Sequence, residues 1–166
     1  MLVLWRYGAP EVDRLLSARE LAALRDARRS TAVGQALRRH WLPVTATDRA
    51  PQIGGGPLRL RLLGEALVLF RDQDGRLGLL DAYCPHEGGS LAAGRVADGG
   101  LQCMLHGWAF AVTGQRVDGG ATHQGASRTT AYPVRESDGT VWAYLGEPGS
   151  EPALVSSERL PGDTSH

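Results

Sequence analysis

The sequence predicts a mainly β protein, folded as an antiparallel β-sandwich or open barrel, with a short helical N-terminal extension. Glycine (22) and proline (9) are plentiful among the 166 residues, which is typical of short strands joined by many turns. Short apolar runs flank two Asp-Gly pairs, and such pairs favour the tight turns of β-hairpins. Hydrophobic residues make up 42% of the chain, which is enough for a core. We expect the extension at residues 1–40, the β-domain at 41–147 and a flexible tail at 148–166.

The N-terminal extension carries two helical signals. Residues 17–20 (SARE) form a capping-box pattern, in which the serine hydroxyl and the glutamate carboxylate each satisfy a free N–H at a helix start. A second, shorter helix is predicted at residues 34–39, ending before Trp41. We expect the arginines of this region to form a solvated helix face, with docking to an acidic electron-transfer partner as the sharper alternative. They are Arg25, Arg28, Arg29, Arg38 and Arg39.

The first half of the β-domain predicts three strands. Residues 58–62 alternate strictly between leucine and arginine, as a half-buried strand does. Apolar runs at 67–70 and 77–83 flank Asp74-Gly75 and therefore predict a hairpin. Tyr83, at the end of the second run, is expected to lie in the strand core.

The second half of the β-domain predicts another hairpin. Residues 129–135 and 141–145 are the two runs that flank Asp138-Gly139. From residue 147 onward, prolines, glycines and polar residues dominate the chain. This composition predicts a poorly ordered end.

The overall charge argues against two classes of partner. Eighteen basic residues balance eighteen acidic ones, so no overall field attracts nucleic acid or an anionic membrane. The apolar runs are far shorter than the roughly 18 residues that span a bilayer, and the apolar start at residues 1–5 is too short for a secretory signal. We therefore expect a soluble cytoplasmic protein, in which a lone pair of cysteines is more typical of a metal or redox site than of a disulfide.

Both cysteines and two of the five histidines fall in two short motifs, Cys84-x-His86 and Cys103-x-x-His106, with sixteen residues between them. Two thiolates and two imidazoles make a four-ligand set for a metal centre. Zinc fingers pair like ligands, whereas each motif here mixes the two types. A Rieske [2Fe–2S] centre needs two cysteines on one iron and two histidines on the other, which mixed pairs on two facing loops supply. The pattern favours this cluster, with a structural zinc site and a Cys84–Cys103 disulfide as alternatives.

The flanking sequence resembles a known family. Residues 63–110, which contain both motifs, resemble the Rieske domain of ring-hydroxylating oxygenases, in the phthalate-dioxygenase-like branch of the large subunit. Residues 34–44 (GQALRRHWLPV) and 131–146 (AYPVRESDGTVWAYLG) resemble the entry and the closing strands of that domain, so the resemblance covers about residues 30–147. It implies a Rieske-type fold with a cluster-binding subdomain of two loops.

The resemblance also implies a role for each ligand. Cys84 and Cys103 would bind the inner iron, and His86 and His106 the outer iron near the surface, where electrons enter and leave. The sequence departs from the family pattern at several positions, one of which is the absence of the usual proline after Gly119-Gly120. Glu87 stands where the family usually has arginine, Leu105 where it often has tyrosine, and Ala111 where it has aspartate. None of these changes removes a ligand, so they bear on redox tuning and on partner specificity.

Large subunits of this branch are considerably longer and carry a second, mononuclear iron held by two histidines and a carboxylate. The spare histidines here are His40, His123 and His166, and they do not suggest such a site. His40 is expected to be a packed or surface residue, His123 to lie in a polar loop, and His166 is terminal. We therefore expect no catalytic residue in this chain.

Three functions stay open on the sequence alone. The first is an electron-transfer component, which accepts electrons from a reductase or ferredoxin and passes them to an oxygenase catalytic subunit or domain. The second is the N-terminal part of a truncated or split oxygenase α-subunit. The third is a non-enzymatic redox sensor or structural metal domain. The sequence supports an oligomer only weakly.

Overall fold

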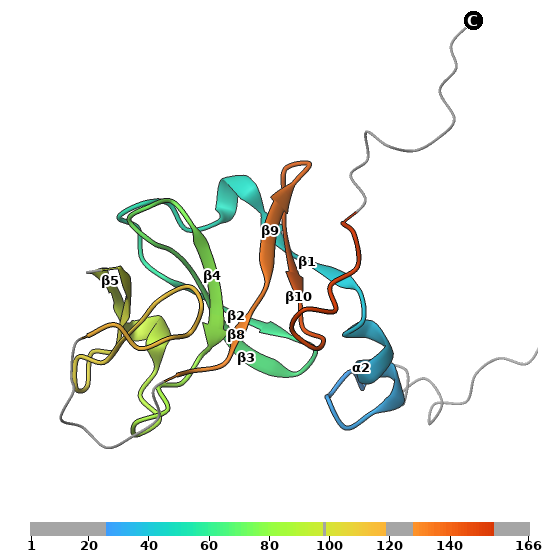
Figure 1. Cartoon of the computed structure of the whole chain (residues 1–166), viewed down its shortest axis with the longest axis horizontal. Coiled ribbons are helices and arrows are strands. Elements are labelled where there is room, and N and C mark those ends of the chain that lie inside the picture. Colours follow the sequence, from blue (N-terminus) through green and yellow to red (C-terminus); the bar gives the residue numbers. More distant parts are fainter. Residues whose placement is uncertain (1–25, 98, 119–127, 155–166) are drawn as a thin grey trace, which may run out of the picture.

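Three antiparallel sheets build the computed structural model, which describes residues 26–97, 99–118 and 128–154 (Figure 1). The first sheet has the order β1-β10-β9, with β1 at Trp41–Ala46, β10 at Thr140–Tyr144 and β9 at Val134–Ser137. The second has the order β2-β3-β4-β8, with β2 at Leu58–Leu62, β3 at Glu65–Arg71, β4 at Leu77–Asp81 and β8 at Ala131–Tyr132. The third has the order β5-β6-β7, with β5 at Arg95–Ala97, β6 at Gly100–Gln102 and β7 at Ala109–Phe110.

Helical structure in the described residues is limited to α2 at Ala32–Leu37 and two 3₁₀ turns, Thr47–Arg49 and Leu91–Ala93. The predicted mainly β fold is therefore confirmed. None of the described helices is long and apolar enough to cross a membrane. The capping-box helix predicted at residues 17–20 lies outside the described residues.

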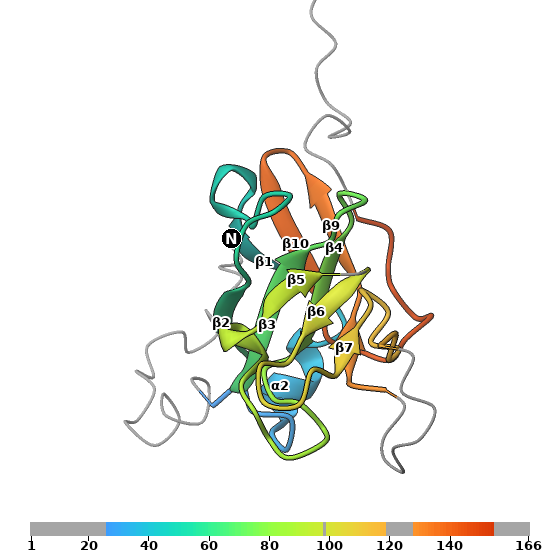
Figure 2. The same cartoon turned by 90° about the vertical axis from the view of Figure 1, so that its left-hand side faces the viewer.

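The central sheet is buried on both faces. Leu67 and Leu69 of β3 belong to a core shared with β4 and β10, whereas Val68 and Phe70 belong to a second core shared with β6 and β7. Figure 2 shows the small sheet in front of β3 and β4, with β9 and β10 behind them. Successive strand residues point to opposite faces, so the run at 67–70 is apolar throughout because both faces are covered. Each such buried side chain contributes about 1.5–3 kcal/mol.

Both predicted hairpins are present. Gly75 takes a positive φ of 83° in the β3–β4 turn, and the carboxylate of Asp72 accepts a hydrogen bond from the N–H of Arg76 (2.8 Å). In the β9–β10 turn both Asp138 (φ 50°) and Gly139 (φ 70°) have positive φ. A two-residue turn with positive φ at both positions matches the twist of the strands it joins.

The single strand predicted at residues 129–135 is wrong, because the chain changes sheets there. β8 pairs with β4, whereas β9 pairs with β10. Pro133 lies between them and has no N–H to donate to a ladder. Its carbonyl oxygen accepts from the N–H of Tyr144 (3.0 Å). The segment therefore ties the first and second sheets together.

Tyr83 was predicted to lie in the strand core, and this is also wrong. β4 ends at Asp81, and Tyr83 is 45% exposed, with its hydroxyl accepting a hydrogen bond from Arg59 (2.9 Å). Alternation explains the difference, because the neighbours Ala82 and Cys84 point inward and Tyr83 therefore points out.

The second predicted helix is present two residues earlier than expected. Its start is set by Thr31, whose hydroxyl oxygen accepts a hydrogen bond from the N–H of Gly34 (3.0 Å) as an N-cap. Gly34 is buried against the preceding loop, and a Cβ at this position would lie 2.0 Å from the carbonyl oxygen of Arg28. This glycine lets the loop fold back onto the helix.

We expect Gly34→Ala to lower the free energy of unfolding by about 1–3 kcal/mol, since backbone atoms must move to admit the methyl group. Chemical denaturation of the two proteins measures the difference. Gly56→Ala is the matched control, because a Cβ at Gly56 meets nothing within 4 Å. Equal losses in both variants would contradict the close packing at Gly34.

The segment after β10 returns to the domain as far as the structure describes it. The indole N–H of Trp41 donates to the carbonyl oxygen of Pro152 (2.7 Å). The hydroxyl of Tyr144 donates to the carbonyl oxygen of Ser150 (3.1 Å). Residues 150–152 belong to the predicted tail, so these bonds attach its first part to β1 and β10. The rest of that tail, from residue 155, lies outside the described residues, and the domain boundaries stay a prediction.

Candidate metal centre

The two Cys/His motifs lie in loops with the same backbone pattern. The first loop follows β4 and the second joins β6 to β7. In each loop the fourth residue after the cysteine is a glycine, Gly88 or Gly107, whose N–H donates to the carbonyl oxygen of Cys84 (2.9 Å) or Cys103 (3.0 Å). Both glycines have positive φ, 73° and 75°, which other residues rarely adopt. This shared turn brings each histidine back beside its cysteine.

The structure brings together the two cysteines of the candidate ligand set, and likewise its two histidines. Cys84 and Cys103 are buried, with 3% and 2% exposure, and both thiols are free. The rings of His86 and His106 meet edge to face, with centroids 4.6 Å apart. The side chain of His106 is 45% exposed. The cysteines therefore lie on the inside and the histidines toward the surface, which is the order that the family resemblance implies.

The donor set can be tested for its fit to a Rieske cluster. The Nδ1 atom of His86 is buried and has no hydrogen-bond partner among the described residues. A buried polar atom without a partner is rare and calls for a ligand. At Gly89 a Cβ would lie 3.1 Å from the sulfur of Cys103, so the absence of a side chain there lets the first loop approach that sulfur closely. Two free buried thiols and an unpaired imidazole nitrogen fit the cluster.

Burial raises the pKa of the Cys84 thiol, and the nearby Cys103 acts in the same direction. The backbone N–H groups of His86 and Glu87 act against this rise. A thiol of this kind ionises readily only beside a cation, and a bound metal deprotonates a coordinating thiol outright. The same backbone N–H groups would then face the sulfur, where they stabilise negative charge.

His86 lies at one end of a stack of three side chains, followed by Trp108 and Arg116. The Trp108 ring lies parallel to that of His86, with centroids 4.3 Å apart and planes 11° apart. The guanidinium of Arg116 lies 3.7 Å from the centroid of the same indole. Asp118 holds this guanidinium through two hydrogen bonds, one of them 2.7 Å long, and the pKa of its carboxyl is lowered chiefly by that hydrogen bonding. Trp108 is 2% exposed and lies in the core that contains both cysteines.

Arg116 and Asp118 were not predicted from the sequence. They follow β7 in a loop, and nothing in their spacing to the Cys/His motifs indicates that they lie beside the site. Only the return of this loop across Trp108, seen in the hydrogen bond from the N–H of Val117 to the carbonyl oxygen of Ala109 (2.8 Å), places them there.

The surface around the histidines combines charge and apolar side chains. A carboxylate oxygen of Glu87 lies 3.7 Å from Nε2 of His106, and both side chains are exposed. Met104 and Leu105, in the second loop, are each 61% exposed. The position of Glu87 agrees with the predicted change of charge beside the outer ligands.

The spare histidines do not form a second site in the described part of the chain. His40 is exposed, and His123 and His166 lie outside the described residues. Within residues 26–97, 99–118 and 128–154, His86, Glu87 and His106 form the only group of three or more metal-binding side chains with ligand atoms close together.

The fold and the donor set define the class of this protein. The chain belongs to the Rieske [2Fe–2S] domain family, whose model matches residues 40–141, and domains of this family bind a [2Fe–2S] cluster. Among known proteins it is similar to the phthalate 4,5-dioxygenase oxygenase subunit of Pseudomonas putida, with 43% identity over 128 residues, covering 74% of this chain and 29% of the relative. It is also similar to the 3-chlorobenzoate-3,4-dioxygenase oxygenase subunit of Comamonas testosteroni, with 41% identity over 137 residues, covering 80% and 32%.

Solved structures show the same likeness. Apo dicamba monooxygenase matches with a TM-score of 0.63 and 28% identity, covering 70% of this chain and 36% of that one. The oxygenase in the reduced oxygenase–ferredoxin complex of carbazole 1,9a-dioxygenase matches with a TM-score of 0.59 and 31% identity, covering 70% and 31%. The chain thus spans about a third of the length of the relatives it matches.

Proposed function

We propose that Cys84, His86, Cys103 and His106 hold one Rieske [2Fe–2S] cluster, and that the chain passes electrons through it in a ring-hydroxylating oxygenase system. The observation that carries this is the arrangement of the four donors on two loops of one pattern, cysteines inside and histidines outside. When bound, such a cluster supplies a one-electron couple at roughly −150 to +300 mV.

Three groups of residues would contribute to electron transfer through the cluster. The buried cysteines lie with Trp108 in an apolar core, which excludes water from the sulfur ligands. The exposed edge of His106 gives a partner a short path to the outer ligands. The stack of Arg116 and Trp108 holds the plane of the His86 ring.

For the partners we propose a reductase or ferredoxin as the donor and an oxygenase iron as the acceptor, located outside the described residues. Support for the donor comes from the carbazole dioxygenase relative, whose oxygenase forms a complex with ferredoxin. A second candidate is that the chain corresponds to the N-terminal part of an oxygenase α-subunit. Its match to only about a third of the length of its relatives favours this candidate. A cytoplasmic location and an oligomer stay predictions.

Iron and acid-labile sulfide analysis, followed by EPR of the dithionite-reduced protein, tests the cluster. We expect two irons and two sulfides per chain and a signal whose average g is below two. Zinc without sulfide, or no such signal in a protein that contains iron, would contradict the proposal. Stopped-flow reduction by a ferredoxin–reductase pair then separates an electron carrier from a structural metal domain, since only a carrier is reduced within turnover times.

Glu87 is expected to lower the reduction potential of the loaded protein, because its carboxylate lies 3.7 Å from the outer ligand His106. Removing this charge in Glu87→Gln should raise the potential by tens of millivolts, and by less at high salt, since the carboxylate is exposed. A potentiometric titration followed by EPR measures the change. Asp48→Asn, which removes an exposed charge on another element, is the control and should leave the potential unchanged. If both variants shift the reduction potential equally, the effect comes from the net charge of the protein. This result would contradict a specific effect of the contact between Glu87 and His106.

A further inference from the structure

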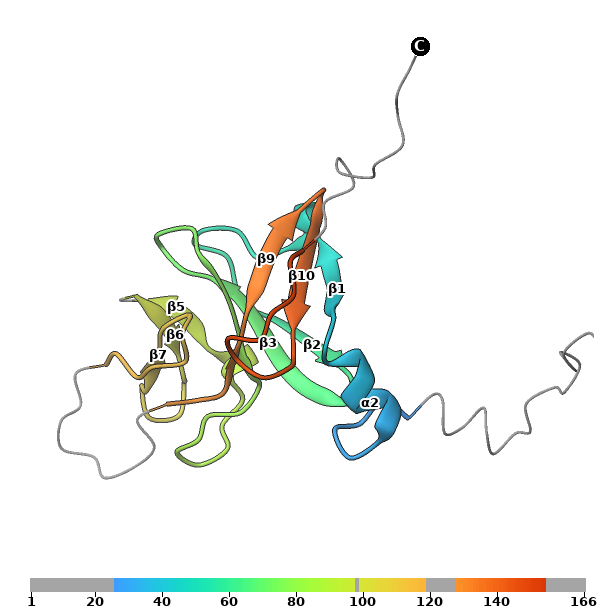
Figure 3. The same ribbon diagram turned by 45° about the vertical axis from the view of Figure 1, so that its right-hand side comes forward.

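A pocket lies at the end of the molecule opposite the candidate metal centre. It has a volume of about 720 Å³ and is formed between the region of α2 and the segment after β10. Figure 3 shows α2 and the small sheet β5–β7 at opposite ends of the described chain. Arginines come from the α2 side and apolar side chains from the other: Arg29, Arg38, Arg39, Tyr144, Pro148 and Pro152.

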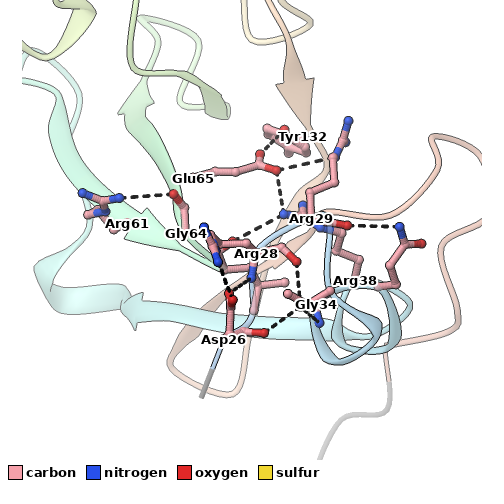
Figure 4. Close-up of polar contacts among 12 residues, drawn as sticks. Asp26, Arg28, Arg29, Gly34, Arg38, Arg61, Gly64, Glu65 and Tyr132 are labelled. Carbon is pink, nitrogen blue, oxygen red and sulfur yellow. Dashed lines mark hydrogen bonds and ion pairs between the residues drawn. The ribbon is translucent and has the colours of Figure 1, made fainter. Parts of the chain in front are cut away.

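Arg38 is the central residue of this pocket. Although the sequence predicts a solvated arginine, it is 5% exposed, because α2 packs its side chain against the start of β3 (Figure 4). Its Nη2 atom pairs with the carboxylate of Glu65 (2.6 Å) and lies 3.5 Å from the carbonyl oxygen of Leu63. Its Nε and Nη1 atoms are buried and have no hydrogen-bond partner among the described residues. A guanidinium carries five N–H donors in one plane, and those on two of its three nitrogen atoms are unmatched here.

Glu65 does not supply the missing acceptor. Its carboxylate already accepts a hydrogen bond from the hydroxyl of Tyr132, pairs with Arg38 and lies 3.6 Å from Nε of Arg29. Burial and the bond to Glu65 raise the pKa of Tyr132, so its hydroxyl stays protonated and remains a donor to this carboxylate. The free donors of Arg38 therefore need an acceptor from elsewhere.

The charge of the pocket favours an anion. Three arginines line it, and Glu147 is the acidic residue among its lining side chains. Arg39 is exposed and has no ion-pair partner among the described residues. Guanidinium groups form strong, charge-assisted hydrogen bonds with carboxylates, and Nε and Nη1 of Arg38 are the donors left to make them.

We propose that this pocket binds a small organic carboxylate, with the charged group against Arg38 and an apolar body against Tyr144, Pro148 and Pro152. The apolar side of the lining is the reason to prefer a carboxylate with a hydrocarbon body over inorganic phosphate. Nε and Nη1 of Arg38 are buried, so binding requires side chains of the pocket to move and expose them. The proposal does not involve the candidate metal centre and does not depend on the proposed function.

The segment that closes the pocket is held in place by two bonds. The indole of Trp41 donates to Pro152 and the hydroxyl of Tyr144 donates to Ser150. A ligand in the pocket contacts this segment, so the indole N–H of Trp41 becomes a reporter of binding that lies outside the lining residues.

Titration calorimetry of the full chain with benzoate, at constant ionic strength, tests the proposal. We expect one saturable site, weaker binding of inorganic phosphate, and a shift of the Trp41 indole N–H resonance that saturates with the heat. Arg38→Lys keeps a cation beside Glu65 but loses the Nε and Nη1 donors, and should weaken benzoate binding about tenfold. Arg49→Lys, at an exposed arginine outside the pocket, is the matched control and should bind as the unmodified chain does.

Arg39→Gln gives a second measure that is independent of the buried ion pair, and should also weaken binding. If Arg38→Lys does not fold, the benzoate affinity of Arg39→Gln alone tests the contribution of the pocket arginines. The proposal is overturned if benzoate shows no saturable binding, if phosphate binds as tightly as benzoate, or if Arg39→Gln and a folded Arg38→Lys bind as the control does.

Discussion

Replacing Cys103 by alanine is expected to give a protein that retains no cluster. Cys103 is one of the two thiols in the described fold, and both lie buried beside the histidines of the two loops. With one thiolate gone, the inner iron site has only Cys84 left, and no other cysteine exists in the chain to replace it. Iron, acid-labile sulfide and the EPR signal should all fall to background in the purified variant.

Met104→Ala is the matched control for this loss. Met104 follows Cys103 in the same loop and is 61% exposed, so its side chain contributes little to the core. This variant should keep its iron, sulfide and EPR signal. A Cys103→Ala protein that retains two irons and two sulfides would show that the four donors were assigned wrongly.

The donor set could be predicted from the sequence because metal chemistry is local. Each loop carries its cysteine and histidine within two or three residues of one another, and the glycine that shapes the turn follows four residues after the cysteine. The two Asp-Gly hairpins could also be predicted from the sequence, because their tight turns require positive φ at only one or two adjacent residues. Features of this kind need no knowledge of how distant parts of the chain meet.

The rest depends on contacts between distant residues, which composition and periodicity do not show. Arg116 lies over Trp108 only because its loop folds back across β7. Arg38 looked like one of several solvated arginines, yet it is buried against Glu65, which is far away in the sequence. Pro133 could have indicated the break between β8 and β9, and it was the one local signal that the predicted single strand overlooked.

Trp108→Ala is expected to have the second large effect, on both stability and the metal centre. Trp108 is fully enclosed in the core that contains both cysteines, and truncating such a side chain costs about 3–5 kcal/mol. Its loss also removes the ring that lies parallel to His86. We expect a lower denaturation midpoint and a broadened or shifted EPR signal of the loaded, reduced protein. Trp142→Ala, at a half-buried indole in the β1-β10-β9 sheet, should leave the signal unchanged.

Two further variants separate the stack from the bulk of the indole. Trp108→Phe keeps an aromatic face against His86 and should restore most of the signal, although a smaller ring leaves a cavity in the core. Arg116→Met keeps the apolar contact with Trp108 but removes a cation 3.7 Å from the indole centroid. If the stack only fills space, this variant should have an unchanged potential. If the cation acts through Trp108 and His86, the potential should fall, because a positive charge near the cluster favours its reduced form. A fall in potential with an unchanged denaturation midpoint is the result that assigns Arg116 to redox tuning.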